Sequence, residues 1–124
     1  MQINWMATSA WAVLALGVGH ILMGLLRFRQ AFLETLRDGL VGQFHHNDTR
    51  RVGFWFTIFG PLLMLVGHLA VNAARAGDLH LFSIIGGYLI PIALLGVIAW
   101  PRSPFWAALI VGGVLLAVGQ GWLA

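Results

Sequence analysis

Long apolar runs alternate with shorter polar segments along the chain. Four runs contain no Asp, Glu, Lys or Arg, and they extend over about residues 3–26, 52–74, 81–100 and 105–123. Since a bilayer core about 30 Å thick is crossed by roughly 20 apolar residues of helix, each run is long enough to span a membrane. In lipid the backbone must form its hydrogen bonds within the segment, so helices are expected. The pattern predicts a single domain, residues 1–124, that is an all-α membrane protein with four transmembrane helices in an antiparallel bundle.

The longest polar segment, residues 27–51, carries a helical pattern of its own. Its large apolar residues fall on one face of a helical wheel, and they are Phe28, Phe32, Leu33, Leu36, Leu40 and Phe44. Glu34, Arg37 and Asp38 fall on the opposite face. This pattern predicts an amphipathic helix at the membrane surface between the first and second spans. A helix packed against the base of the bundle is the alternative.

The charged residues indicate how the spans are oriented. All seven basic residues are Arg, and five of them lie in residues 27–51. Because cytoplasmic loops of membrane proteins carry an excess of basic residues, residues 27–51 and Arg102 are expected in the cytoplasm. Both termini are then periplasmic, in a bacterial inner membrane. Such clustering is a topology signal toward anionic lipid, so no nucleic-acid partner is predicted.

Composition agrees with lipid as the surrounding solvent. Hydrophobic residues make up 60% of the chain and charged residues 9%, whereas soluble domains average roughly 45–50% and 25%. A chain this short cannot bury so much apolar surface in one core of its own. There is no Cys, which excludes disulfides and thiolate metal sites.

Two histidines, His20 and His68, lie inside the predicted spans, where ionisable residues often mark functional sites. Their helix faces are expected to face each other inside the bundle. With other polar residues they could line a cavity for a small hydrophobic ligand, a quinone or a proton. These additional candidates are Asn72, Thr57, Tyr88 and Gln120. The alternative is that each histidine hydrogen-bonds a neighbouring helix and fixes helix pairing.

A haem held by both histidines is disfavoured by their depths. His20 lies seven residues from Arg27 at the inner boundary, and His68 lies seven residues from Arg75 at the outer boundary. The two rings are therefore expected about 10 Å apart along the bundle axis, whereas haem ligands must lie at one level. No cofactor is predicted.

Other familiar chemistry is weakly supported. His45, His46 and Asp48 form a short polar cluster, but adjacent histidines point in different directions and no matching third ligand is evident. No metal site is therefore predicted. Sequence motifs of the common enzyme classes are missing, and no catalytic residue is assigned. A membrane enzyme or a ligand binder that uses His20, His68 and Asn72 is the alternative to a protein without enzymatic activity.

Small residues at four-residue spacing suggest helix packing. Gly113, Ala117 and Gly121 repeat in this way near the C-terminus, and Ala15 and Gly19 do so in the first run. Such spacing lets helix backbones approach closely in lipid. The contact could be made within the bundle, with a second copy of the chain, or with a larger membrane complex.

Three short stretches resemble a known family. They are Gly17-Val18-Gly19-His20 followed by Gly24, Leu36-Arg37-Asp38-Gly39, and Phe54-Trp55-Phe56 followed by Gly60. In these residues the chain is similar to an uncharacterised family of small bacterial four-helix membrane proteins, a domain of unknown function. The resemblance implies four spans and a bacterial origin, and it implies no activity. We therefore expect a small membrane protein of unknown biochemical role that acts as a packing, accessory or oligomerising subunit.

Overall fold

The computed structural model describes residues 1–123, and this part of the chain contains helices and no strand. The helices are α1 (Trp5–Arg27), α2 (Arg29–Arg37), α3 (Asp48–Ala76), α4 (Leu79–Ala99) and α5 (Phe105–Gly119). The all-α prediction is confirmed.

Side-chain caps fix where three of the helices begin. The side-chain oxygens of Asn4, Asn47 and Asp78 each accept a hydrogen bond from the backbone N–H three residues later, at 3.0, 2.9 and 3.0 Å. Each cap satisfies a donor that has no partner within its helix. Helix α3 ends at Gly77, whose φ of 69° suits a residue without a side chain. The three side-chain caps explain where α1, α3 and α4 begin, and Gly77 explains where α3 ends.

Three helices, α1, α3 and α4, are long and apolar enough to cross a membrane. Helix α5 has 15 residues, which is about 22 Å, and it ends four residues before the predicted run does. Gly121 adopts a φ of 76°, and the N–H of Trp122 turns back to the carbonyl of Ala117 at 2.8 Å. This left-handed turn ends the helix, although the sequence beyond it is still apolar.

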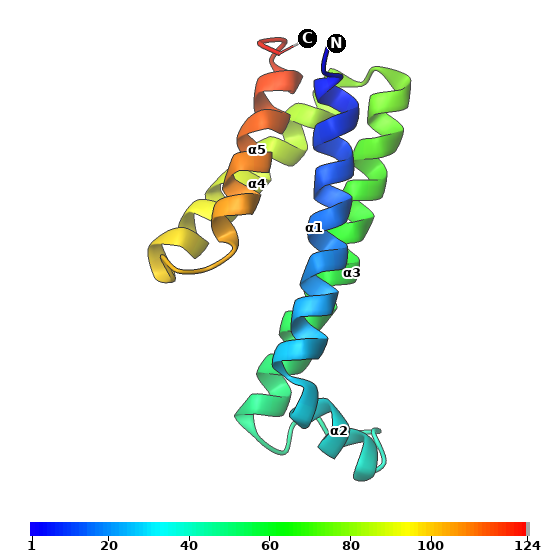
Figure 1. Cartoon of the computed structure of the whole chain (residues 1–124), viewed down its shortest axis with the longest axis vertical. Helices are drawn as coiled ribbons and strands as arrows, with labels where there is room; N and C mark the ends of the chain where they lie inside the picture. Colours follow the sequence, from blue (N-terminus) through cyan, green and yellow to red (C-terminus); the bar gives the residue numbers. More distant parts are fainter. Residues whose placement is uncertain (124) are drawn as a thin grey trace.

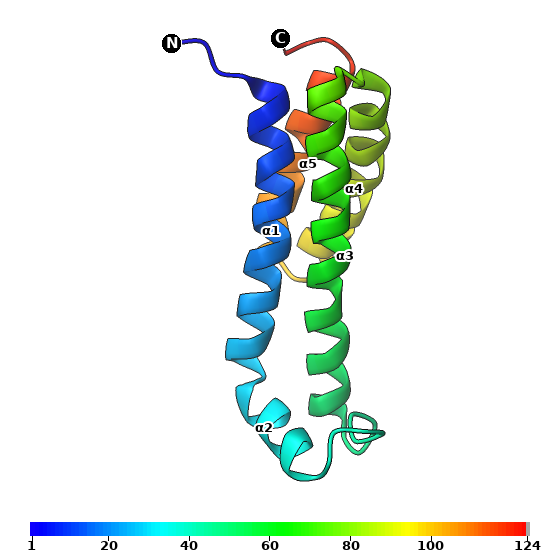
Figure 2. The ribbon, with the colours of Figure 1, turned by 90° about the vertical axis from the view of Figure 1, so that its right-hand side faces the viewer.

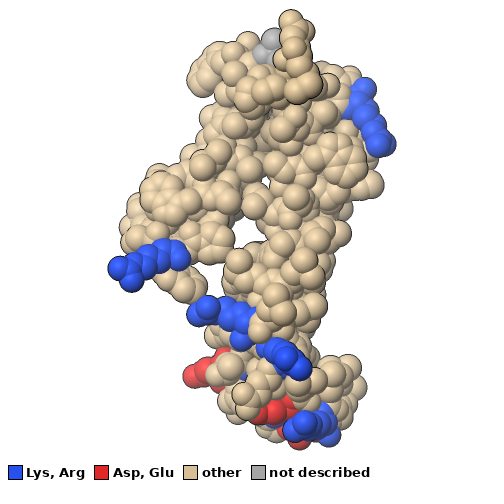
Figure 3. All heavy atoms as spheres, viewed as in Figure 1, with Lys and Arg blue, Asp and Glu red and all other residues tan. Residues whose placement is uncertain are grey.

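The helices form two antiparallel hairpins. Helices α1 and α3 run side by side along the full length of the molecule, and α4 and α5 make a second, shorter hairpin (Figures 1 and 2). Both termini lie at the end of the molecule opposite α2 (Figure 1). Near the termini the hairpins share a core, whose largest fully buried side chains are Val13, Phe82, Leu115 and Val118. Toward the other end the hairpins part, and the space-filling view shows openings between them (Figure 3).

Glycines seven residues apart form the contact between α1 and α3. They are Gly17 and Gly24 on α1, and Gly60 and Gly67 on α3; Gly53 continues the spacing on α3 and meets the side chain of Phe28, just beyond the end of α1. A Cβ added at Gly67 would lie 2.5 Å from the backbone nitrogen of Leu14, so the two backbones nearly touch there. Seven residues are two helical turns, and a seven-residue repeat is typical of left-handed helix pairs. We call this contact the glycine seam.

Close backbone contact at glycines also joins α4 to α5. A Cβ added at Gly86 would lie 2.6 Å from the backbone nitrogen of Leu116 and 2.9 Å from the carbonyl oxygen of Gly112. Gly112 and Gly119 are again seven residues apart on α5. Close approach at small residues thus holds each hairpin together, as expected where lipid removes a hydrophobic drive between helices.

The small residues at four-residue spacing lie elsewhere. Ala15 and Gly19 are exposed on α1, and neither Gly19 nor Gly113 has an atom within 4 Å of the position a Cβ would take. Ala117 is partly buried, and Gly121 lies beyond the end of α5. Gly19 and Gly113 therefore make no helix contact among residues 1–123, because the nearby Gly17 and Gly112 occupy the contact faces. Their use against a second copy or a larger complex stays a prediction.

Helix α2 packs against the start of α3. Ala31 and Thr35 are buried on its inner face, whereas Leu33 and Leu36 are exposed on its outer face. The helix is shorter than the predicted pattern and holds polar and apolar residues on both sides. Its packing matches the second alternative drawn from the sequence.

Candidate functional site

His20 and Thr57 lie along the glycine seam. The imidazole of His20 stacks on the ring of Phe56, with centroids 4.1 Å apart and planes inclined by 15°. One turn away, the side chain of Thr57 contacts the backbone position of Gly24. Its hydroxyl is buried and has no hydrogen-bond partner among residues 1–123. Both polar side chains therefore lie in the close contact between α1 and α3 and do not line a cavity.

His68 and Asn72 lie on a different side of α3. Both side chains are exposed, and with a spacing of four residues they share one face of the helix. The expectation that His68 faces His20 inside the bundle is wrong. Gly67 takes the contact position, and the next residue on an α-helix is turned by about 100° from it.

The remaining predicted ligand-binding residues belong to the second hairpin. Tyr88 on α4 is 72% exposed. Gln120 follows α5, and its Nε2 donates a hydrogen bond to the Oγ of Ser83 at 3.1 Å. The six candidates are therefore divided among the seam, the open side of α3 and the second hairpin, and they do not converge on one site.

His20 and His68 lie at very different levels along the molecule. His20 stacks on Phe56, and His68 follows Phe56 by 12 residues on the same helix. At 1.5 Å per residue this places the rings about 18 Å apart along the helix axis. The offset is larger than the sequence predicts, and one haem iron cannot reach both rings.

The polar cluster at the start of α3 is held by local contacts. The rings of His45 and His46 stack with centroids 4.7 Å apart. The carboxylate of Asp48 accepts a hydrogen bond from Arg51 at 3.1 Å. Within residues 1–123, no three His, Asp or Glu side chains are arranged to hold a metal ion.

A buried arginine ties α2 to α3. Arg50, in the first turn of α3, is only 7% exposed. Its guanidinium donates to the carboxylate of Asp38 at 2.7 Å and to the carbonyl of Gln43 at 3.4 Å, and it lies 3.7 Å from the carboxylate of Glu34. This cluster was not predicted from the sequence. The available signal was the four-residue spacing of Glu34 and Asp38, which puts two carboxylates on one side of α2.

Three other arginines at this end are exposed and have no ion pair in the described part of the chain: Arg27, Arg29 and Arg37. The guanidinium of Arg27 lies over the ring of Trp100, 5.7 Å from its centroid, and so links α1 to the tip of the second hairpin. Charged side chains gather toward the α2 end of the molecule (Figure 3). Residues 27–51 at this end carry five Arg and three acidic residues, a net charge of +2, so we call it the basic end; the opposite end carries Arg75 and Asp78.

Comparison with known proteins finds a single kind of match. Residues 4–122 match the Family of unknown function (DUF6463). No curated protein and no solved structure matches the chain. The resemblance to a family of unknown function is confirmed over nearly the whole sequence, and no assigned activity comes with it.

Proposed function

Since the chain belongs to this family of unknown function, we infer its role from its own residues. We propose that it is a four-span protein of a bacterial inner membrane. We also propose that it pairs with a second copy of itself and has no enzymatic activity. The observation that carries this proposal is the exposed polar pair, His68 and Asn72, on α3.

The hairpin arrangement supports four spans. Helix α5 runs back along α4 after a turn of a few residues, and both termini lie at the same end of the molecule (Figure 1). If α4 crosses the bilayer, α5 must return through it. The basic end, with residues 27–51 and Arg102, is then cytoplasmic, and the two termini are periplasmic.

The polar pair needs a partner at this depth. His68 lies seven residues, about 10 Å, from Arg75 at the outer boundary. In the proposed topology His68 is therefore well inside the hydrocarbon layer. An imidazole or amide that faces lipid leaves its hydrogen-bonding groups unsatisfied. A polar contact between transmembrane helices is worth about 0.6–2 kcal/mol. Burial of this face against another helix therefore favours association.

A second copy is the partner that fits the pair most simply. A two-fold axis along the membrane normal brings each residue to the depth of its own counterpart. His68 and Asn72 of one copy then meet the same two groups of the other. Imidazole and amide groups each donate and accept hydrogen bonds, so the face is complementary to itself.

The test is the oligomeric state of the full chain in lipid nanodiscs, measured by native mass spectrometry over a range of protein concentrations. We expect a dimer, and we expect His68→Leu with Asn72→Leu to raise its dissociation constant about ten-fold, because roughly 1–2 kcal/mol of polar contact is lost. Tyr88→Leu is the matched control, since it removes an exposed polar group on the other hairpin. A chain that stays monomeric, or a dimer equally affected by the control, would contradict the proposal.

Topology is tested separately with a reporter fused to the C-terminus. Alkaline phosphatase is active only in the periplasm, and a fluorescent protein that folds only in the cytoplasm provides the opposite readout. We expect activity from the phosphatase fusion. A fluorescent cytoplasmic fusion would overturn the orientation, and it would leave the pairing test unaffected.

A further inference from the structure

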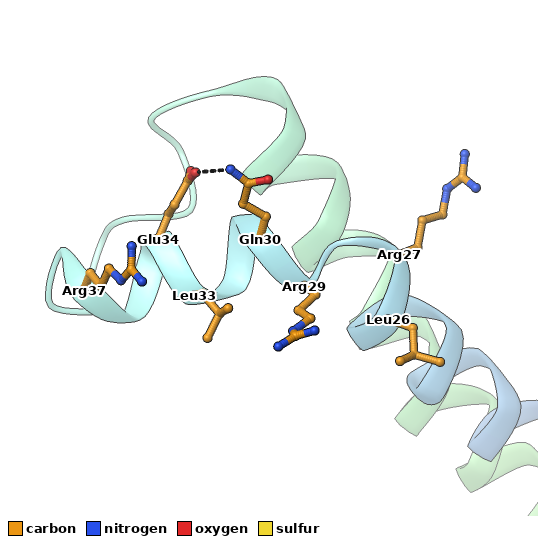
Figure 4. A pocket seen from close by; sticks show the side chains of 7 residues that line it. All are labelled: Leu26, Arg27, Arg29, Gln30, Leu33, Glu34 and Arg37. Atoms are coloured by element: carbon orange, nitrogen blue, oxygen red, sulfur yellow. Dashed lines mark hydrogen bonds between the residues drawn. The ribbon is translucent and has the colours of Figure 1, made fainter.

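The elbow between α1 and α2 forms a groove of about 530 Å³ with both basic and apolar walls. Arg27, Arg29 and Arg37 supply the basic groups, and Leu26 and Leu33 supply the apolar surface. In Figure 4, Leu26, Arg29 and Leu33 lie on one side of the ribbon. The groove thus presents guanidinium groups next to exposed leucines.

The positive charge of the groove is not cancelled within the described residues. None of its three arginines is in an ion pair there. Glu34 also lines the groove, but both oxygens of its carboxylate have partners. One accepts a hydrogen bond from Gln30 at 3.1 Å (Figure 4), and the other lies 3.7 Å from Arg50. The groove therefore favours an anion, and guanidinium groups pair well with phosphate oxygens.

The apolar walls favour an amphiphile over a free ion. Leu26 is 76% exposed and Leu33 is 43% exposed, although both adjoin the arginines. An inorganic anion gains nothing from such surface, whereas the upper part of an acyl chain would cover it. The groove also lies where α1 ends, which is the cytoplasmic boundary of the bilayer in the topology proposed above, and the argument for a lipid depends on that topology.

We propose that this elbow binds the phosphate of an anionic phospholipid, with the headgroup against Arg29 and Arg37 and the first part of an acyl chain against Leu26 and Leu33. Arg27 adds charge from the end of α1 while its guanidinium lies over Trp100. An anionic lipid is preferred to a zwitterionic one because its headgroup brings no cation to oppose the arginines.

The test is native mass spectrometry of the full chain released from micelles that contain equal parts of phosphatidylglycerol and phosphatidylcholine. We expect phosphatidylglycerol to be retained in preference. The double variant Arg29→Gln with Arg37→Gln should lose that preference, by about five-fold in affinity for each arginine. Arg75→Gln removes the same charge at the opposite end of the molecule and should leave retention unchanged. Equal retention of both lipids, or equal loss in the control, would overturn the proposal.

Further arms separate the lipid from free phosphate and from the proposed pairing. Leu26→Gln with Leu33→Gln should weaken retention of phosphatidylglycerol, and added inorganic phosphate should not displace the lipid. Displacement by phosphate would assign the groove to the free ion and overturn the lipid assignment. The same spectra report the ratio of monomer to dimer. A chain that keeps phosphatidylglycerol but fails to pair would contradict only the role given to His68 and Asn72.

Discussion

Replacing Gly67 by alanine is a minimal test of the glycine seam, since it adds a single methyl group. That methyl group would lie 2.5 Å from the backbone nitrogen of Leu14 and 2.6 Å from its Cα. Both are backbone atoms of α1, so no side-chain rotation relieves the clash. Ordinary van der Waals contact begins at 3.4 Å, and to go from 2.5 to 3.4 Å the helices must separate locally by about 0.9 Å.

The energetic cost follows from that separation. A gap of 0.5–1 Å between surfaces in contact forfeits roughly a quarter to a half of the dispersion attraction between them. Inserting a methyl group into a packed interface generally costs about 1–3 kcal/mol. Because the contact at Gly67 involves backbone on both sides, we expect the free energy of unfolding to fall by about 2 kcal/mol.

Unfolding is followed by circular dichroism while sodium dodecyl sulfate is added to the protein in a mild detergent. Gly19→Ala is the control, because it adds the same methyl group to α1 at a position with no atom within 4 Å. The control should leave stability unchanged or raise it slightly, since alanine favours helix over glycine. If Gly67→Ala unfolds at the same detergent fraction as Gly19→Ala, the seam does not hold α1 to α3.

Three further predictions concern other contacts. In the monomer, Gly112→Leu should lower the unfolding free energy because Gly112 lies against α4, whereas Gly113→Leu should leave it unchanged because that position is open; the same detergent titration compares them. Arg50→Gln should cost about 2 kcal/mol through loss of a charged hydrogen bond and should speed proteolysis of residues 38–47, as measured by limited digestion. Trp100→Ala should free the tip of the second hairpin from Arg27, at a cost of about 1 kcal/mol, which would show as reduced cross-linking between two cysteines placed beside, and not at, these two residues.

Much of the fold can be predicted from the sequence, because long runs without charged residues indicate apolar helices. The boundaries follow from caps such as Asn47, and the hairpins follow from short turns. Helix α5 is the exception. One glycine in the left-handed conformation, Gly121, ends it early, although Trp122 and Leu123 continue the apolar run.

The packing faces were harder to predict for a physical reason. In a membrane helix both the lipid side and the protein side are apolar, so hydrophobic periodicity does not tell them apart. The four-residue spacing of small residues predicted packing at Gly19 and Gly113. The glycines that make the close helix contacts are instead spaced seven residues apart. That repeat is visible at Gly53, Gly60 and Gly67, and a search at that period would have found the seam.

The candidate site was predicted least well, because it depends on rotation and on contacts distant in sequence. His68 follows Gly67, which lies in the seam. Because successive residues of a helix point in directions about 100° apart, His68 lies on the exposed side of α3. The burial of Arg50 depends on how the loop after α2 folds back, which no local pattern records.

The unequal lengths of the two hairpins have a consequence for the surrounding membrane. Helix α5, at 15 residues, is about 8 Å shorter than a hydrocarbon layer of about 30 Å, whereas α3, at 29 residues, reaches about 43 Å. If all four helices cross, the acyl chains beside α5 must compress to avoid hydrophobic mismatch, while α3 tilts or extends into the headgroups. The protein then deforms the bilayer unevenly around its circumference, with the thinnest lipid beside α5.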